Sequence, residues 1–497
     1  MQLANTAGSA APPLTPAAPS EASTTKTTAL FSNLSLLRNL KIGTFHIGSA
    51  LADILANGVW NRVMIQELGY AATPVALLLA LRYFLAPLSV WVGRRSDKRA
   101  IFGYHRLPYV WGGRLMMVAS YVLLGGSTLL LARGYDPFVE IFSLGTMNIT
   151  VTVNHSDPLG WLGVVAALLL FSLGSTFSGT TFLSLLYDRT PKTQRTRAVS
   201  VVWMFLIIGF AVAGIFYSRL LPDFTREGFL SLFLIAPLFM AGIWFFAVVG
   251  EEKPAQKGSY REGAESAPDT LPFWGEMRRV LASKQTRLFF IFLAFGNLFF
   301  YIQDVILEPF AGKVFGMPLA TTNRFSTYWG SLALIGIVVS LVLARRYPKR
   351  VTNMALSRWG VAVLLITFAL FIVCAVFQIR PLVTINLIVM GIGLGMWTVG
   401  SLGLMMDMTR VWGAGLYLAL WTVSSTLARG MGVALGGIIL DVALALTGER
   451  APLAYGAVFA AQTVGFGVTL AILSRISVGE FEREVPSTEA VLAGSLD

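Results

Sequence analysis

The chain is organised around a short basic stretch, GRRSDKRAIFGYHRLPYVWGG, at residues 93–113. Long apolar runs flank it, from about residue 72 to residue 92 and from residue 107 to residue 132. Five residues between Arg94 and Arg106 are Lys or Arg, and Asp97 is the one carboxylate among them. Because loops rich in Lys and Arg stay on the cytoplasmic side of a membrane, we expect this stretch to be a cytoplasmic loop between two membrane-spanning helices.

Composition predicts a polytopic membrane protein. The chain is 55% hydrophobic and 13% charged, whereas soluble domains carry about 25% charged residues. Its net charge of +12 would suit a nucleic-acid partner only if the basic residues gathered on one folded face. They lie instead in short loops between apolar runs, so we expect no nucleic-acid partner. The single cysteine, Cys374, excludes an internal disulfide framework.

Runs of about 20 apolar residues predict twelve spans. We expect them at residues 42–66, 72–93, 107–132, 159–183, 198–218, 229–249, 287–309, 325–344, 359–379, 381–404, 415–438 and 453–474. The tails and loops on one side then hold 27 Lys and Arg residues, and the loops on the other side hold 7. This asymmetry predicts that both termini are cytoplasmic. The remaining four fall within spans: Arg62, Arg82, Arg114 and Arg429.

The segments between spans suggest the domain organisation. Residues 1–37 are rich in Ala, Pro, Ser and Thr, which predicts a disordered cytoplasmic tail. We expect a six-helix half at 38–250, a polar cytoplasmic linker at 251–286, a second half at 287–475 and a cytoplasmic C-terminal tail at 476–497. The loop at 133–158 is expected on the external side, with brief strand pairing that includes Thr150–Val153.

The two predicted halves resemble each other in sequence. Residues 61–67 near the end of span 1 parallel residues 303–308 near the end of span 7, and residues 187–190 after span 4 parallel residues 406–409 after span 10. Parallel six-helix repeats are typical of major facilitator transporters. The predicted fold is therefore an all-α polytopic membrane protein of the major facilitator superfamily, with 12 transmembrane helices in two six-helix halves.

Polar residues inside spans are costly in lipid and normally face protein or a cavity. At about 100° per residue, spans 1 and 7 each carry one polar stripe. The two stripes are expected to line one central cavity that binds a pigment or substrate, or else to join the halves through ion pairs, such as Arg62 or Arg82 with Asp304 or Glu308. The candidate binding residues are His46, Asp53, Asn57, Asn61, Arg62, Asn297, Tyr301, Asp304 and Glu308.

His46 has two interpretations. A neutral imidazole ligates metals, including the magnesium of a chlorophyll, but a lone histidine near the start of a span also hydrogen-bonds a neighbour or interfacial water. His105 and His155 lie in loops on opposite sides, so no three-histidine metal site is expected. The chain has no phosphate-cradling P-loop motif.

Carboxylates near the cytoplasmic ends of spans are candidate latches between conformations. Asp97 is expected to accept from a helix N-terminus and from Arg106 or Arg114. Asp188 with Arg195, and Asp407 with Arg410, are expected to act in the same way. The alternative is that these basic residues only set the topology.

Four segments together carry a family resemblance. They are NRVMIQELG at 61–69, RSDKRAIFGYHRLPYVWG at 95–112, QDVILEPF at 303–310, and Leu420-Trp421 running to ARGMG at 428–432. Over residues 38–475 the chain resembles the PucC/LhaA group of the major facilitator superfamily, the bacteriochlorophyll-delivery branch of phototrophic bacteria.

The resemblance implies an assembly factor for light-harvesting antenna complexes. Such a protein would carry bacteriochlorophyll as cargo, without catalysis, to the antenna α and β polypeptides beside bacteriochlorophyll synthase. It would lie among the lipids of the bacterial inner membrane, cytoplasmic or intracytoplasmic. The alternative from the fold alone is a proton-coupled secondary transporter of a small solute that uses Asp53, Asp304 or Glu308 as its protonated group.

Overall fold

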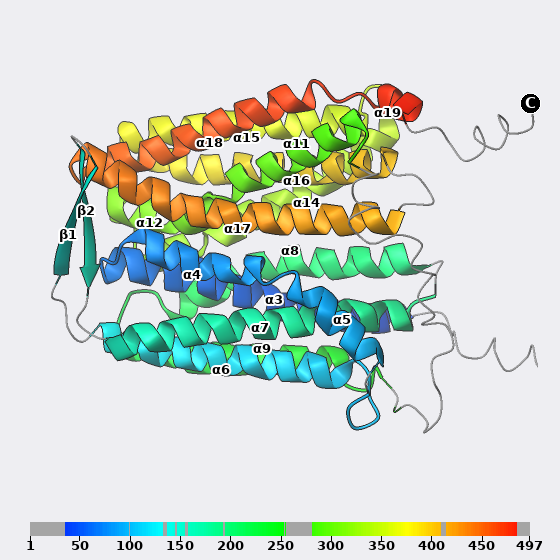
Figure 1. The fold of residues 1–497 in the computed structure, drawn as a ribbon, viewed down its shortest axis with the longest axis horizontal. Helices are drawn as coiled ribbons and strands as arrows, with labels where there is room; N and C mark the ends of the chain where they lie inside the picture. The colour runs from blue at the N-terminus through cyan, green and yellow to red at the C-terminus, as the bar shows by residue number, and fades with distance from the viewer. Residues whose placement is uncertain are drawn as a thin grey trace, which may run out of the picture.

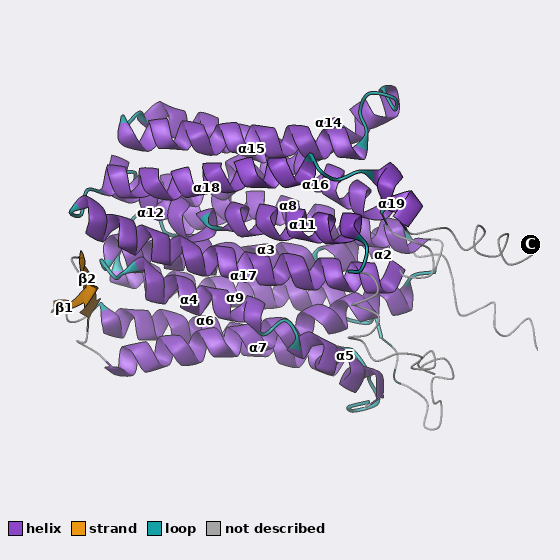
Figure 2. Ribbon diagram, turned by 45° about the horizontal axis from the view of Figure 1, so that its top comes forward, coloured by secondary structure: helices purple, strands orange, loops and turns teal. Residues whose placement is uncertain are grey.

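The computed structural model describes residues 35–98, 100–132, 137–144, 147–154, 158–191, 194–252, 254, 281–408 and 414–484. Long helices run roughly along one axis and form one bundle (Figures 1 and 2). Most of the expected N-terminal tail and most of the expected linker lie outside the described residues.

The first half begins with α2 (Leu36–Gly43), α3 (Phe45–Ile54) and two π-helical segments, η2 (Leu55–Trp60) and η3 (Val63–Glu67). It continues with α4 (Ala72–Phe84), α5 (Leu88–Lys98), α6 (Leu107–Leu131), α7 (Pro158–Arg189), α8 (Arg195–Leu220) and α9 (Arg226–Val248).

The second half begins with α11 (Lys284–Tyr301), α12 (Gln303–Phe315) and α13 (Leu319–Asn323). It continues with α14 (Phe325–Arg346), α15 (Asn353–Val376), α16 (Arg380–Asp407), α17 (Ala414–Thr447) and α18 (Ala451–Leu473), and the short α19 (Val478–Glu484) follows. Because α19 packs on α11, part of the expected C-terminal tail belongs to the folded bundle.

Within the described residues, ten helical segments are long and apolar enough to cross a membrane, and Ala72–Phe84 is a shorter apolar helix. Predicted spans 1 and 2 do not appear among the ten because both are interrupted. Span 2 breaks at residues 85–87, between α4 and α5. Pro87 explains the break, since proline has no backbone N–H and disfavours α conformation in the residue before it. The span predicted over 72–93 is therefore built from two helices, α4 and α5.

Span 1 departs from a regular α-helix at Leu55, where η2 begins. π-helical turns close i→i+5 hydrogen bonds and often occur at functional sites. They rotate the side chains that follow relative to an α-helical wheel. The angles that place residues beyond Leu55 on the predicted polar stripe of span 1 therefore do not hold. In the structure, both Asn61 and Arg62 contact the second half.

The expected strand pairing in the loop at 133–158 is confirmed. Strands β1 (Pro137–Leu144) and β2 (Met147–Asn154) are antiparallel, with Pro137 opposite Asn154 and Leu144 opposite Met147. They lie at one end of the bundle, which we call the hairpin end; α5 and α19 lie at the other end, the tail end (Figure 1). Strand β2 contacts α17.

The most extensive contacts between the halves are those of α4 with α17 and of α8 with α14. Close approach depends on glycine: a Cβ at Gly437 would lie 2.5 Å from the Ala72 carbonyl oxygen, and one at Gly330 would lie 3.3 Å from Phe210 Cβ. After the break at residues 85–87, α5 packs on α7 of its own half. The break therefore separates a part of span 2 that joins the halves from a part that does not.

Candidate functional site: a charge cluster between the halves

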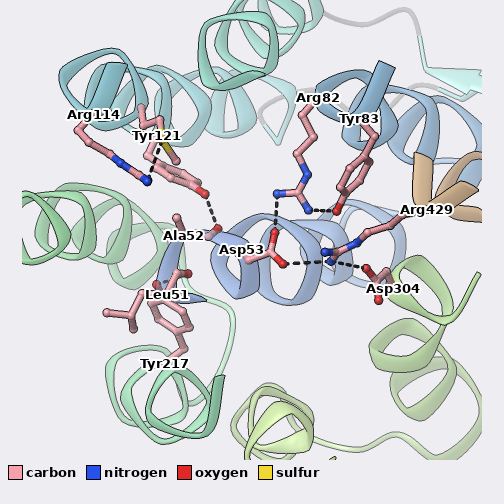
Figure 3. A network of polar contacts seen from close by, with 11 residues as sticks. Leu51, Ala52, Asp53, Arg82, Tyr83, Arg114, Tyr121, Tyr217, Asp304 and Arg429 are labelled. Carbon is pink, nitrogen blue, oxygen red and sulfur yellow. Dashed lines mark hydrogen bonds and ion pairs between the residues drawn. The ribbon is translucent and has the colours of Figure 1, made fainter. Parts of the chain in front are cut away.

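Four charged side chains meet where the halves join. Asp53 comes from α3, Arg82 from α4, Asp304 from α12 and Arg429 from α17 (Figure 3). Arg82 Nη1 lies 2.5 Å from Asp53 Oδ1, and Arg429 Nη2 lies 3.1 Å from Asp53 Oδ2 and 2.9 Å from Asp304 Oδ2. Arg429 thus bridges one carboxylate of each half.

The cluster balances two cations with two carboxylates. A buried charge without a partner is costly, so the loss of any one of the four side chains would leave another charge unpaired. The side chains are nevertheless not sealed: Arg429 is 23% exposed, Asp53 17% and Asp304 14%. A space that admits water therefore borders the cluster in the interior of the bundle.

Tyrosine rings hold the two guanidinium groups. The Tyr83 ring centre lies 4.5 Å from Arg82 Cζ and 5.0 Å from Arg429 Cζ, and the Tyr301 ring centre lies 4.2 Å from Arg429 Cζ. The Tyr83 hydroxyl also accepts a hydrogen bond from Arg82. Cation–π contact in a desolvated site is worth about 2 kcal/mol, so Tyr83 couples the arginine of one half to that of the other.

Two further tyrosines fix the backbone next to Asp53. Tyr121 on α6 donates to the Ala52 carbonyl, and Tyr217 on α8 donates to the Leu51 carbonyl at 2.8 Å (Figure 3). Both tyrosines are buried. Hydrogen bonds from two different helices restrain α3 just before it turns into η2, and so they fix the direction of the Asp53 side chain.

Span 1 also reaches into the second half closer to the hairpin end. Asn61 Nδ2 donates to the Val305 carbonyl at 2.9 Å. Arg62 Nη2 donates to the Met317 carbonyl at 2.7 Å, and Arg62 Nη1 donates to the Thr322 hydroxyl. Since the Arg62 side chain is only 3% exposed, these bonds are its main compensation for burial.

Asp441 forms a second bond set between the halves at this end, and the sequence analysis did not identify it. Its carboxylate, on α17, accepts from the backbone N–H of Ala72 at 2.9 Å and of Thr73 at 2.7 Å. These N–H groups form the N-terminus of α4, where a negative charge is stabilising. The available signal was an acidic residue inside an apolar run.

The same end carries contacts between α8 and the α13–α14 region. Ala320 N donates to the Pro222 carbonyl, and the Thr327 hydroxyl donates to the Ala211 carbonyl, each at 2.8 Å. Together with Arg62 and Asp441, they place bonds between the halves on both sides of the bundle.

The other predicted members of the two stripes are distributed more widely. Asn297 donates to Leu293 of its own helix at 2.8 Å, and so forms no described bond between the halves. Glu308 is buried and lies beside Gly58 of η2, with its Oε1 3.7 Å from the position a Cβ would take there. Asn57 is buried, and its Oδ1 has no hydrogen-bond partner among the described residues.

The ion pairs suggested from sequence are wrong in their partners. Arg82 pairs with Asp53 rather than with Asp304 or Glu308, and Arg62 lies 3.4 Å from Glu67 of its own segment. Arg429 supplies the cation for Asp304. Sequence reasoning counted Arg429 among the charges within spans without giving it a role.

At the tail end, Arg106 joins helices of the first half. Its Nε lies 3.1 Å from Asp188 Oδ2 on α7, and its Nη1 donates to the Ser96 hydroxyl on α5 at 2.6 Å. The expected Asp188–Arg195 pair is therefore replaced: Arg195 Cζ lies 5.5 Å from the ring centre of Tyr187.

Two acidic residues after α9 were not identified from sequence. Glu252 accepts from the backbone N–H groups of His105, Arg106 and Leu107 at 2.8–3.1 Å, and so caps α6. Glu251 pairs with Arg38 at 2.7 Å and with Lys41 at 3.0 Å. The start of the linker is thereby fixed to the first half.

The remaining latch candidates form no described bond between the halves. Arg114 lies inside the first half, where it donates to the Ser49 hydroxyl at 3.1 Å and lies 4.3 Å from the ring centres of Phe45 and Trp244. Asp407 accepts from Asn353 at 2.9 Å. The Asp97 side chain and Arg410 lie outside what the structure describes.

His46 lies on α3 among aromatic rings. Its ring centre is 5.3 Å from that of Phe182 on α7 and 6.3 Å from that of Trp203 on α8. His46 Nδ1 is buried without a hydrogen-bond partner among the described residues, while Trp203 is 49% exposed. The described part of the chain contains no group of three or more His, Cys, Asp or Glu residues that fits a metal ion.

Comparison with known proteins gives a consistent family and fold. A model of the family described as PUCC protein matches residues 59–481. Protein PucC of Rhodovulum sulfidophilum is 27% identical over 415 residues, which cover 82% of this chain and 86% of that protein. The bacteriochlorophyll synthase 44.5 kDa chain of Rhodobacter capsulatus is 26% identical over 469 residues, which cover 92% and 99%.

Among solved structures, a bacterial homologue of the human lysosomal transporter Spinster superposes with a TM-score of 0.62 at 13% identity, covering 90% of this chain and 95% of that one. This likeness shows the fold, which is the predicted all-helical, multi-pass major facilitator fold. The family match extends over most of the chain and agrees with the resemblance found in its sequence. The chain belongs to the PucC protein family.

Proposed function

We propose that the protein is an assembly factor for bacterial light-harvesting antenna complexes, which holds bacteriochlorophyll and delivers it to the antenna α and β polypeptides. The observation that carries this proposal is the family match over residues 59–481. A relative of nearly equal length is named as a chain of bacteriochlorophyll synthase, which supports work beside that enzyme. The chain itself acts by binding, without catalysis.

Within this proposal, His46 is the candidate ligand for the magnesium of the pigment. A neutral imidazole suits that ligation. The neighbouring Trp203, 49% exposed, offers apolar surface to a flat macrocycle. His46 Nδ1 forms no hydrogen bond with a described residue, so a hydrogen bond at this nitrogen does not compete with a ligand.

We infer that the protein lies in the bacterial inner membrane with both termini cytoplasmic. The excess of Lys and Arg in alternate loops supports this orientation. The tail end would then face the cytoplasm, where α5 and the start of the linker lie.

The experiment is purification in mild detergent from a phototrophic host, followed by near-infrared absorption and mass spectrometry of the chains that co-purify. Bound bacteriochlorophyll together with antenna polypeptides or the synthase is the expected result. His46→Ala is expected to lose pigment, and His105→Ala, a change in a loop histidine, is the matched control. A colourless protein without these partners, reproduced in lipid discs, would contradict the proposal.

A second candidate function is proton-coupled transport of a small solute. Arg429 favours it, because one cation bridges Asp53 and Asp304 across the halves, and protonation of either carboxylate would weaken that bridge. Uptake into proteoliposomes that depends on a proton gradient and is lost in Asp304→Asn would support this function. Pigment binding that is unchanged in the same variant would separate the two functions.

A further inference from the structure

A groove on the first half lies between α3 and α9, apart from the charge cluster. Its volume is about 490 Å³, and its lining consists of Thr44, Ile47, Leu238, Phe239, Gly242, Ile243 and Phe246. The Thr44 hydroxyl donates to the Lys41 carbonyl at 2.7 Å, so the one polar side chain of the lining is already bonded. Leu238 and Phe246 are both more than half exposed, so the groove opens toward the bilayer. Such a surface accepts hydrocarbon.

Two features give the groove its shape. At Gly242, an added Cβ would meet no atom within 4 Å, so this residue leaves a notch in the surface of α9. The Phe239 ring stacks on Phe216 of α8, with ring centres 5.0 Å apart, and thereby joins α9 to α8 beside the groove. The apolar lining from Leu238 to Phe246 follows α9 toward the tail end (Figure 1), so a flexible hydrocarbon chain can lie along it.

The end of the groove near the tail end carries positive charge. Lys41 Nζ lies 5.9 Å from the ring centre of Phe246, which lines the groove. Arg38 lies one turn earlier, and its side chain is 39% exposed. Both cations share one carboxylate, Glu251, so one positive charge is left over at this rim.

We propose that the groove binds one acyl chain of an anionic phospholipid, with the phosphate group at Lys41 and Arg38. An apolar channel that ends at a net positive rim matches a hydrocarbon chain joined to an anionic head group. Bacteriochlorophyll also carries an esterified hydrocarbon chain, but it has no anionic head group to match the positive charge of Lys41 and Arg38. This site is independent of the proposed function.

The test is native mass spectrometry of the delipidated full-length protein with equimolar phosphatidylglycerol and phosphatidylcholine of identical acyl chains. The wild type is expected to retain phosphatidylglycerol preferentially. Lys41→Gln and Arg38→Gln are each expected to reduce that preference about fivefold. Gly242→Leu is expected to abolish retention by filling the notch. Gly126→Leu on α6 is the matched control, since a Cβ there also meets no atom within 4 Å.

Equal retention of both lipids by the wild type would overturn the proposal, as would unchanged retention in Gly242→Leu. Lys41→Gln changes a partly exposed side chain and so provides a second variant if Gly242→Leu fails to fold. Added bacteriochlorophyll that displaces phosphatidylglycerol from the wild type, and binds less well to Gly242→Leu than to Gly126→Leu, would assign the groove to pigment and also overturn it.

Discussion

The two ends of the bundle hold together in different ways. At the hairpin end, Arg62 and Thr327 donate hydrogen bonds across the halves, and Asp441 accepts hydrogen bonds from the other half. At the tail end, the contacts described for Arg106 and Glu251 join helices of the first half to one another. The charge cluster around Arg429 bridges the halves through helices that meet between these ends. The halves are thus fixed to each other from the cluster to the hairpin end.

This difference follows from the breaks in the helices. Span 2 leaves α17 where Pro87 ends α4, and the π-helical part of span 1 turns Asn61 and Arg62 toward the second half. Movement between the halves therefore has to start at the tail end or break the bonds of the hairpin end. Substitutions at the cluster and at each end should therefore weaken the contact between the halves to different extents.

The largest effect is expected for Arg429→Met. The change leaves Asp304 without its cation and removes one of the two cations of Asp53. Loss of one partner from a buried ion pair costs about 3–5 kcal/mol, so folded yield and thermal unfolding temperature in detergent should fall sharply. The double variant Arg429→Met/Asp304→Asn should recover part of the loss. A single variant as stable as the wild type would show that the cluster does not hold the halves together.

Arg62→Gln should open the hairpin end with a smaller loss of stability. Its bonds to the Met317 carbonyl and the Thr322 hydroxyl are lost, but the neutral Gln leaves no buried charge unpaired because Glu67 is partly exposed, so the net loss should be about 1.5–3 kcal/mol. The readout is maleimide labelling of Ser326→Cys, a buried position between α8 and α14, on a Cys374→Ala background. Labelling should be faster than in the parent. The same slow rate in both proteins would contradict the role assigned to Arg62.

A paired comparison of two aspartates sharpens the difference between the ends. Asp441→Asn weakens the bond from α17 to the N-terminus of α4, at a cost of about 1 kcal/mol, and should raise labelling of Ser326→Cys moderately. Asp407→Asn changes a tail-end carboxylate whose described partner is Asn353 of the same half, and should leave that labelling unchanged. Equal effects of the two substitutions would remove the distinction between the ends.

The smallest effect is expected for Glu251→Gln. Glu251 itself is buried, but its partners Arg38 and Lys41 reach solvent at 39% and 26% exposure, so both cations stay solvated without it and the loss should be about 1 kcal/mol. Unfolding temperature should change little and labelling of Ser326→Cys should not change. Limited proteolysis near Arg38 should become faster because α2 loses its attachment to the start of the linker. A large increase in labelling would mean that the ion pairs of Glu251 also control contact between the halves.

Much of the fold is predictable from sequence because apolar length and loop charge are local signals. Ten predicted spans have counterparts among the helices long enough to cross a membrane, and the strands near Thr150 appear where expected. The site was predictable only in part. Asp53 and Asp304 were identified because charge in an apolar run is rare, but their pairing with Arg429 depends on how four helices meet, which no periodicity describes.

The sequence by itself determined the membrane class, the family and the residues costly enough in lipid to need partners. Those properties depend on composition and on patterns within single segments. Tertiary structure decided which charges pair, that Asp441 caps α4, and that Glu252 caps α6. The two caps join residues at least 145 positions apart, and Arg429 lies 376 positions from Asp53 and 125 from Asp304. The geometry of these contacts therefore depends on helix packing and on breaks such as that at Pro87, and not on the local sequence.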